Sequence, residues 1–525
     1  MRRLLGSSVA FWFAGAFLLS GVMHAQRRGY WPVQGGNVEH DNWQKAETKI
    51  TTDTVAKDFK FLWKIKLGSG ISKSASFGEP LLLPGLITAR GFKDMTLVGG
   101  NNSLYSVDSV LGTLIWKKDF TLQSSVGEGS CGGSAIQIVM EPPHVIHFGA
   151  HRPHAKHAGP VASAAPSSAS TQRRIGVIPD RGYFGLKGIY VVTSDGYLHE
   201  QILATGLDYA PAVKFLPESN GNASALNMTD HVIYAETRRS CRNVPNSVWS
   251  IDLNTSAYNV NSYKTGKLSV WNLSGPTIGT GGIVYVTTGG GSAYPQQGLY
   301  PHSTVALTAT DLKQQDWYAP LGKEIHSSMS ASPVMFKYDN KQLVAAPGKD
   351  GSLVLLDSTS LGSSDHRTPL TKTPNISKSG DWAGLASWQS KDGGVWVLAS
   401  YSGRTDPNVK FAYTNGSASH GSMVALKVEE KNGHTVLTPV WISRDLTSPA
   451  PPAIANGVVF ALSGGSASKH ATLYALDAST GKELYSSKDA IKSYTRLSGM
   501  AVGDGRVFFT THNNTLYAFG IPMEH

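Results

Sequence analysis

A short strand-and-turn segment recurs along the chain and constrains its fold more than any other feature. Its clearest copy is LYALDASTGKELY at Leu473–Tyr485, where an alternating strand leads into Asp, small turn residues and a second strand with an aromatic end. Degraded copies begin near Leu104, Val248, Val305, Leu353, Met423 and Leu516. Period-2 alternation bounded by turn residues is typical of antiparallel sheet. Recurrence every ~45–60 residues favours a solenoid or a propeller.

Two further strands precede most copies and complete a four-stranded unit. One is an apolar run such as Gly457–Gly465, and the other often begins at Ser/Ala–Pro, as in Ser330–Phe336. Four antiparallel strands per repeat form a propeller blade. We count eight units, which start near Ser76, Ser130, Tyr209, Ser274, Ser330, Ala383, Pro451 and Gly499. The sequence therefore predicts an all-β fold, an eight-bladed β-propeller.

The last unit has about three strands, and an unassigned strand near the start of the chain supplies the fourth. We expect Phe61–Leu67 to pair beside Leu516–Phe519, because closing the ring removes a free sheet edge. The expected organisation is a single propeller over residues 61–520, an extension at 26–60 and a tail at 521–525.

Residues 1–25 have the features of a secretory signal peptide. Arg2 and Arg3 precede the apolar run Val9–Leu19, and Ala25 ends the expected cleavage site. No other stretch approaches the ~20 apolar residues of a membrane span. We therefore expect a secreted or periplasmic monomer. Its basic residues are spread along the chain, which argues against nucleic-acid binding.

The chain has two cysteines, Cys131 and Cys241, which suits an oxidising compartment. The repeat pattern places Cys131 at the start of an inner strand and Cys241 in a loop of the next blade. Both positions fall on the same face of the disc. We predict a Cys131–Cys241 disulfide between neighbouring blades, with two separate thiols as the alternative.

The largest irregularity is an insertion at 142–181 in the second blade, which we expect to be flexible because of its Ala/Ser/Pro run. His151, His154 and His157 are spaced by three, and imidazoles are common transition-metal ligands. They are weak metal candidates, because Pro153 and the loop composition favour a solvated His-rich loop over a helix.

Other long loops join the second and third strands of several blades and share one face, here called the long-loop face. Loops on one rim of a rigid scaffold are where binding usually occurs. We expect a protein or small-molecule ligand there, with loop packing and solubility as the alternative. The residues on these loops include Arg238, Arg239, Arg242, Tyr294, Tyr300, His302, Arg404 and Tyr413.

Seven of the twelve tryptophans fall into two groups. Those near the ends of outer strands are expected to pack between blades, namely Trp63, Trp116, Trp271, Trp317 and Trp441. Trp382 and Trp388 instead flank the inner strand of the sixth blade, which borders the central channel. With Arg238, Arg239 and Tyr294 they are the candidates for binding at the channel mouth.

The unit Leu-Tyr-Ala-Leu-Asp, then Thr-Gly-Lys, then an aromatic residue resembles the repeat of the pyrroloquinoline-quinone (PQQ) propeller family. The opening Trp31–Gln44 and the strand LWKIKL are similar to the start of those proteins, so the resemblance spans about Trp31–Gly520. This family includes quinoprotein dehydrogenases and the scaffold lipoprotein of outer-membrane assembly. The resemblance therefore implies the fold and leaves the activity open.

The dehydrogenases of that family need PQQ, a Ca²⁺ ion held by oxygen ligands and a carboxylate base. They also carry two adjacent cysteines, and an Asn and Asp in the loop that matches Gly289–Ser303. This chain has no adjacent cysteines, and that loop has no Asn, Asp or Glu. We therefore expect a binding or scaffold protein without a cofactor. The alternative is a PQQ- and calcium-dependent dehydrogenase, whose candidate carboxylates are Glu79, Glu128 and Asp381.

Overall fold

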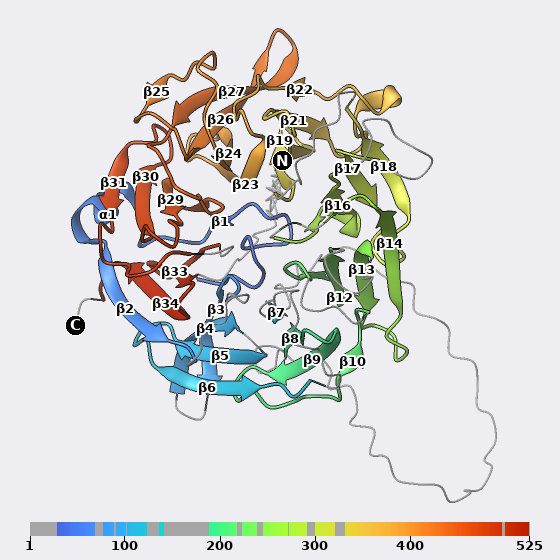
Figure 1. Ribbon diagram of the computed structural model, residues 1–525, viewed down its shortest axis with the longest axis vertical. Coiled ribbons are helices and arrows are strands. Elements are labelled where there is room, and N and C mark those ends of the chain that lie inside the picture. The colour runs from blue at the N-terminus through green and yellow to red at the C-terminus, as the bar shows by residue number, and fades with distance from the viewer. Residues whose placement is uncertain are drawn as a thin grey trace, which may run out of the picture.

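The computed structural model describes residues 29–68, 77–88, 91–100, 102–122, 136–140, 188–217, 223–238, 245–270, 272, 274–290, 300–320, 331–495 and 499–523. Eight small sheets surround a central axis (Figure 1), which confirms the predicted eight-bladed propeller. Cys131, Cys241, Glu128, the three candidate metal-binding histidines and residues 1–25 lie outside the described residues. No helix in the described ranges is long and apolar enough to cross a membrane.

Blades 1 to 5 each take four antiparallel strands from one stretch of chain, and the inner strand comes first. Blades 1 and 2 contain β3 (Leu81–Thr88), β4 (Gly91–Gly99), β5 (Ser103–Asp108) and β6 (Leu114–Asp119), then β7 (Gln137–Met140), β8 (Gly188–Val192), β9 (Tyr197–Ile202) and β10 (Val213–Lys214). Blades 3 and 4 contain β11 (Asn227–Thr229), β12 (Val232–Thr237), β13 (Asn246–Asp252) and β14 (Val260–Gly266), then β15 (Thr277–Ile278), β16 (Val284–Thr287), β17 (Thr304–Leu307) and β18 (Gln314–Tyr318). Blade 5 contains β19 (Val334–Tyr338), β20 (Lys341–Pro347), β21 (Leu353–Asp357) and β22 (Thr371–Lys372).

Blades 6 and 7 each gain a fifth, parallel strand. Blade 6 contains β23 (Asp381–Gln389), β24 (Val395–Ser402), β26 (Gly421–Lys431) and β27 (His434–Ile442), with β25 (Tyr413–Thr414) on its outer edge. Blade 7 contains β28 (Ala453–Ala455), β29 (Val458–Ser463), β30 (Thr472–Asp477) and β31 (Glu483–Ser486), with β1 (Trp43–Gln44) on its inner edge.

Blade 8 joins the two ends of the chain, as the sequence predicts. Its strands β32 (Ala501–Gly503), β33 (Arg506–Thr511) and β34 (Thr515–Gly520) come from the C-terminal end, and β2 (Lys60–Lys66) is the outer strand. Ile65 pairs with Leu516 and Phe61 with Phe519 in antiparallel register. The short helix α1 (Thr52–Asp58) leads into β2 from an N-cap at Thr51 and packs beside β31. The ring is therefore closed by hydrogen bonds between segments more than 450 residues apart.

The segment Tyr30–Gln44, here called the strap, runs through the centre of the ring (Figure 1). It hydrogen-bonds with the inner strand of every blade in chain order. The bonds link Trp31 to Leu82, Pro32 to Met140, Val38 to Asn227 and Ile278, Glu39 to Met335, Asp41 to Ser387, Asn42 to Ile454, and Gln44 to Val502. The strap therefore fixes the position of all eight inner strands relative to one another.

Polar side chains of the strap are buried against the ring and are hydrogen-bonded there. His40 contacts Thr277 through Nδ1 at 3.1 Å and the Asn227 amide through Nε2 at 3.2 Å. Asn42 donates to the Leu385 carbonyl at 2.9 Å. Burial lowers the pKa of His40 to about 3, so its imidazole is neutral at physiological pH. A neutral ring avoids the cost of an unpaired charge at the centre of the disc.

The outer-strand tryptophans pack between blades, which confirms that prediction for those the structure describes. The indole N–H of Trp63 donates to the Ser109 carbonyl of the next blade, that of Trp116 to Leu203, and that of Trp441 to Ala478. Each ring covers a turn glycine with positive φ, namely Gly112, Gly206 and Gly481. Trp317 stacks on His366 of the next blade, with ring centroids 3.7 Å apart. Trp271 lies outside the described residues.

Gly481 tests this inter-blade contact, because a Cβ there would lie 2.6 Å from the Trp441 ring. We expect Gly481→Ala to destabilise the fold by about 2–4 kcal/mol, from steric overlap added to the strain of a positive φ. Gly433→Ala is the matched control, since Gly433 has φ of 76° and nothing within 4 Å of its added Cβ. Thermal and denaturant unfolding of both variants measure the difference. Equal losses of stability would contradict the proposed role of the Trp441 contact.

Candidate functional site

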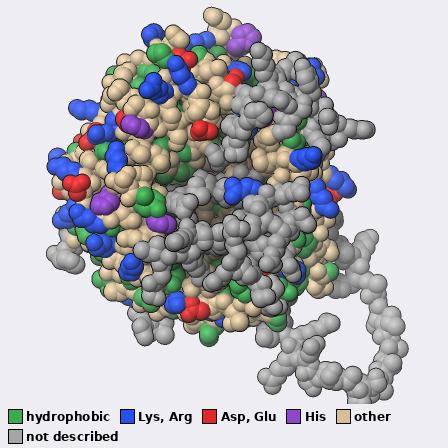
Figure 2. Space-filling model, in the orientation of Figure 1, with side chains coloured by type: hydrophobic (Ala, Val, Ile, Leu, Met, Phe, Trp, Pro, Cys, Tyr) green, Lys and Arg blue, Asp and Glu red, His purple; other side chains and the backbone are tan. Residues whose placement is uncertain are grey.

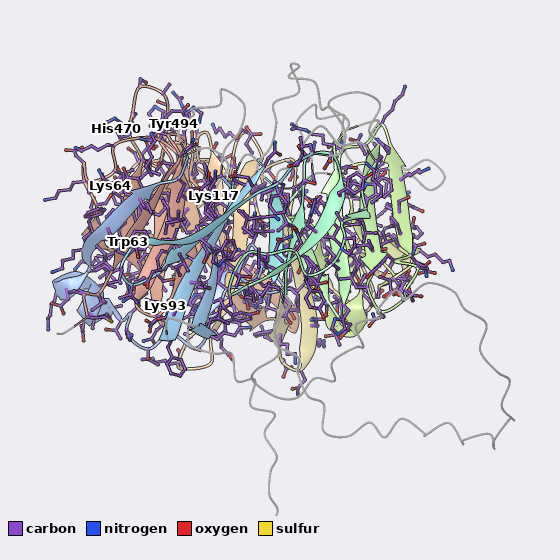
Figure 3. The ribbon with its side chains drawn as sticks, turned by 90° about the horizontal axis from the view of Figure 1, so that it is seen from below. Trp63, Lys64, Lys93, Lys117, His470 and Tyr494 are labelled. Atoms are coloured by element: carbon purple, nitrogen blue, oxygen red, sulfur yellow. The ribbon has the colours of Figure 1, made fainter. Side chains whose placement is uncertain are left out.

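The strap and the long loops occupy different levels of the disc. Figure 3 shows the disc edge-on, with His470 and Tyr494 near one face and Lys93 nearer the other. His470 ends one of the long loops, so its side is the long-loop face. In blade 6 the strap bonds to Ser387, whereas Asp381 begins the same strand. Asp381 and Ser387 are six residues apart on this strand, which corresponds to roughly 20 Å. The start of the inner strand of blade 6 therefore lies away from its contact with the strap.

Lys349 follows β20 on the long-loop face, and it is a buried charged side chain without a hydrogen-bond partner in the described structure. It lies in a tight turn, in which Gly348 N–H donates to the Ser352 carbonyl at 2.8 Å. The Lys349 carbonyl packs against Gly380, where an added Cβ would approach it to 2.2 Å. The residue is 7% exposed, and among the described residues its Nζ has no hydrogen-bond partner. This is an unsatisfied cation at the junction of blades 5 and 6.

Lys349 interacts electrostatically with Asp381 and His302, which come from the two neighbouring blades. Burial lowers the pKa of Lys349 to about 8, and the Asp381 carboxylate partly offsets that effect. Burial, together with the smaller effect of the Lys349 charge, lowers the pKa of His302 to about 4. Both ring nitrogens of His302 are buried without a partner in the described structure. His302 comes from the loop before β17, so this cluster draws on blades 4, 5 and 6.

A second polar cluster lies between blades 3 and 4 and was not foreseen from the sequence. The carboxyl group of Glu236 on β12 accepts the Asn272 N–H at 2.8 Å, and the Asn272 amide accepts the Thr287 hydroxyl at 3.3 Å. Burial raises the pKa of Glu236 well above its ordinary range. The only sequence signal was an acidic residue at the end of an otherwise apolar strand.

These residues do not fit the Ca²⁺ ion that the fold family implies. Calcium takes six to eight oxygen ligands, usually with several carboxylates. Glu236, Asn272 and Thr287 provide one carboxyl group, one carboxamide and one hydroxyl, and these groups already bond to one another. Within the described ranges, no three His, Cys, Asp or Glu residues converge in a way that could hold a metal.

Glu79 is enclosed rather than open to the channel. Its Oε1 accepts the Trp31 indole N–H at 2.9 Å and the Gly35 N–H at 3.0 Å, both from the strap. Its Oε2 abuts Gly499 of blade 8, where an added Cβ would lie 1.9 Å away. Glu79 therefore holds the strap to blades 1 and 8. Burial raises its pKa to about 7, although the two hydrogen bonds act in the opposite direction.

The remaining channel-mouth candidates that the structure describes do not converge on one site. Trp382 is buried between blades 5 and 6 and donates to the Gly348 carbonyl at 3.0 Å. Trp388 stacks on Trp396 within the core shared by blades 6 and 7. Arg238 is exposed at the end of β12, and Arg239, Arg242 and Tyr294 lie outside the described residues. Of the residues named for a role in binding or catalysis, the structure brings His302 and Asp381 near Lys349.

The other loop residues named from the sequence have surface or packing positions. Tyr300 packs its ring against Trp317 at 4.6 Å between centroids. Arg404 is exposed, and Tyr413 lies on β25 at the outer edge of blade 6. Basic and acidic side chains are interspersed over the face drawn in Figure 2.

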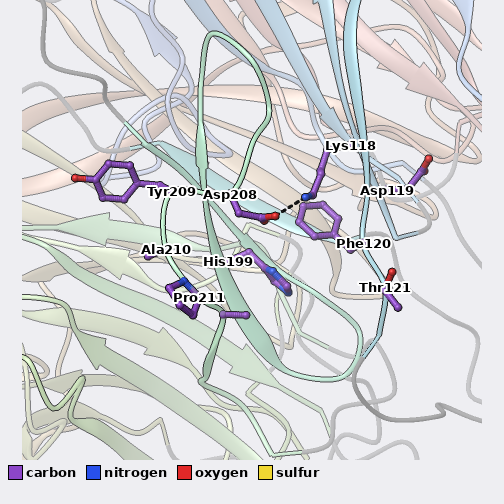
Figure 4. Close-up of a pocket in the computed structure, with 10 residues that line it drawn as sticks. Lys118, Asp119, Phe120, Thr121, His199, Asp208, Tyr209, Ala210 and Pro211 are labelled. Carbon is purple, nitrogen blue, oxygen red and sulfur yellow. Dashed lines mark hydrogen bonds and ion pairs between the residues drawn. The ribbon is translucent and has the colours of Figure 1, made fainter. Parts of the chain in front are cut away.

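A groove of about 530 Å³ lies at the outer rim between blades 1 and 2 (Figure 4). Lys118 on one side of the groove forms an ion pair with Asp208 on the other, with an Nζ–Oδ2 distance of 2.6 Å. The Phe120 and His199 rings pack edge to face, with their centroids 4.8 Å apart. Asp208 also accepts the Gln201 amide at 2.8 Å. The Lys118–Asp208 charges compensate each other, so the rim groove lacks the unmet charge found at Lys349.

Comparison with known proteins agrees with this architecture. Residues 424–521 match the family model described as outer membrane protein assembly factor BamB. The quinohemoprotein alcohol dehydrogenase from Comamonas testosteroni is similar in structure, with 13% identity, a TM-score of 0.55, and coverage of 96% of this chain and 82% of that one. A europium-containing methanol dehydrogenase matches with 12% identity, a TM-score of 0.55, and coverage of 94% of this chain and 98% of that one.

This protein has a PQQ-like β-propeller fold. No curated protein matches its sequence. At 12–13% identity the similarity to the dehydrogenases establishes the fold of the propeller and not its activity.

Glu79 gives the propeller a testable dependence on pH. Its folded-state pKa is about 7 against an ordinary 4.5, so the folded protein keeps a proton that the unfolded chain releases. Stability is therefore lost as pH rises from about 4.5 to about 7. Glu79→Gln keeps an acceptor oxygen and removes the ionisation. We expect the free energy of unfolding of this variant to exceed that of the wild type by up to about 3 kcal/mol at pH 8.

Denaturant unfolding of both proteins between pH 4 and 8 measures this effect. Glu430→Gln is the control, because Glu430 is exposed on β26. Parallel stability profiles for the wild type and Glu79→Gln would show that the Glu79 carboxyl group does not titrate as described.

Proposed function

We propose that this propeller is an exported binding protein that takes an anionic ligand at the long-loop face, and that it does not oxidise alcohols. The observation that carries the proposal is the Lys349 ammonium group, which is buried without a hydrogen-bond partner in the described structure. A desolvated, unpaired charge is unfavourable unless a counter-charge or hydrogen bonds compensate it. A ligand oxyanion would supply both. The signal-peptide features at the start of the sequence, namely Arg2 and Arg3 followed by the apolar run Val9–Leu19, support export.

His302 supports the same ligand chemistry. With a pKa of about 4 it is neutral near pH 7, so one ring nitrogen carries a proton and can donate it in a hydrogen bond to a ligand oxygen. Lys349, with a pKa of about 8, is mostly charged at that pH. One cation and one neutral donor suit a carboxylate or a phosphate group. A protein partner could present the same group on an acidic side chain.

Calorimetric titration with citrate and with inorganic phosphate tests this proposal and separates the two ligand types. We expect one of them to bind at pH 7 and to bind more weakly above about pH 8, where Lys349 loses its charge. Lys349→Met should weaken binding by at least about tenfold, since a charged hydrogen bond contributes about 1.5–3 kcal/mol. Lys267→Met is the control, because Lys267 is exposed.

A site at Lys349 would be contradicted if Lys349→Met and Lys267→Met both lost anion binding, or if both kept it. Binding of neither anion by the wild type would contradict the proposed ligand chemistry itself.

A PQQ- and calcium-dependent dehydrogenase is the second candidate, because the similar solved structures include dehydrogenases. The loop between β16 and β17 lacks Asn, Asp and Glu, and the described polar residues do not fit Ca²⁺. We therefore expect no alcohol- or sugar-dependent dye reduction after PQQ and Ca²⁺ are added. Turnover that is abolished by Glu79→Gln, Glu128→Gln or Asp381→Asn would replace the binding proposal with the enzymatic one.

A further inference from the structure

We infer that Lys349 is a reactive amine that forms an imine with a 2-oxo acid entering at the long-loop face. This inference deepens the proposed function and rests on it, since the same residue would bind the ligand's carboxylate. It adds a covalent step and a narrower ligand class. The Lys349 side chain is almost fully buried, and its amine has no hydrogen-bond partner in the described structure.

The backbone that carries Lys349 is held in a defined turn. Gly348 and Ser352 close the turn on one side, and Gly351 N–H donates to the Gly348 carbonyl at 3.1 Å. Gly380 of the neighbouring segment packs directly against the Lys349 carbonyl. Trp382, two residues after Gly380, donates its indole N–H to the Gly348 carbonyl of the same turn. An anchored turn limits the search of the long side chain and favours a reproducible position for Nζ.

The charged neighbours leave the amine available. Asp350, the adjacent acid, is paired with Lys372 at 2.6 Å and also accepts from Ser352. Asp381 from blade 6 is the ionisable group that acts on Lys349, and the charge of Lys349 in turn acts on His302 from blade 4. A pKa of about 8 leaves roughly a tenth of the amine unprotonated at pH 7. An ordinary exposed lysine has less than about a thousandth in that form.

Imine formation fits these groups and balances without an added oxidant or reductant. The neutral amine of Lys349 attacks the ligand's keto carbon, which forms the C–N bond of a carbinolamine. A proton moves from nitrogen to the hydroxyl oxygen, water leaves, and a C=N bond remains. Desolvated lysines are suited to this chemistry. His302 has an unpaired ring nitrogen that can carry the proton.

A 2-oxo acid suits the site better than a simple aldehyde. The protonated imine keeps the positive charge of Lys349, and the ligand's own carboxylate lies one bond from the reacting carbon. The product therefore brings a carboxylate next to a nitrogen that has no hydrogen-bond partner in the described structure. A neutral aldehyde would add no such counter-charge.

Reductive trapping of the full-length protein tests the inference. Glyoxylate is added with cyanoborohydride, which reduces an imine to a stable secondary amine, and peptide mass mapping locates the carboxymethyl group. At pH 7 we expect Lys349 to be labelled at least about tenfold faster than exposed Lys267, given the larger neutral fraction. The rate should rise to a plateau with a midpoint near pH 8. In Asp381→Asn the midpoint should fall, because the carboxylate that raises the pKa is gone.

The outcomes separate this inference from the proposed function. Equal labelling of Lys349 and Lys267, or a midpoint near that of an ordinary lysine, overturns the reactive amine. Citrate binding without labelling of Lys349 overturns the imine alone. Equal labelling of Lys349 by glyoxylate and acetaldehyde, with no protection by citrate, overturns the preference for a carboxylate and, with it, the anion site.

Discussion

The fold depends on one set of hydrogen bonds, those between the strap and the inner strands of all eight blades. Each blade alone is a small sheet with an open inner edge, and small isolated sheets are marginally stable. The strap satisfies backbone groups on those edges and brings eight separately built sheets into one register. Glu79 secures its start, and β1 secures its end by parallel pairing with β28.

This arrangement decides where a ligand can bind. The strap occupies the centre of the ring, and its polar groups are neutral or paired, as at His40 and Asn42. Lys349, which interacts with Asp381 at the start of the inner strand of blade 6, instead has no hydrogen-bond partner for its Nζ in the described structure. The rim groove has its Lys118–Asp208 pair already formed. The proposed site at Lys349 therefore rests on an unsatisfied charged group and not on the size of a cavity.

The sequence predicted those features that repeat, and it missed those that occur once. Alternating strands such as Leu473–Tyr485 fixed the number of blades, and the spare strand Phe61–Leu67 fixed the closure. Trp63, Trp116 and Trp441 were placed correctly because they recur at one position of the repeat. The strap has no periodicity, and its contacts span the whole chain. Lys349 was missed because a lysine in a glycine-containing turn is usually solvated, and its burial depends on tertiary packing that no local pattern reveals.

The central claim is that the strap is a bonded part of the ring and not a surface loop. Hydrogen–deuterium exchange measured by mass spectrometry tests this most directly. Peptides covering Tyr30–Gln44 should exchange as slowly as those covering the buried strands β12 and β24, because the strap is largely buried and hydrogen-bonded. Exchange of the strap within seconds, while β12 and β24 stay protected, would contradict the account.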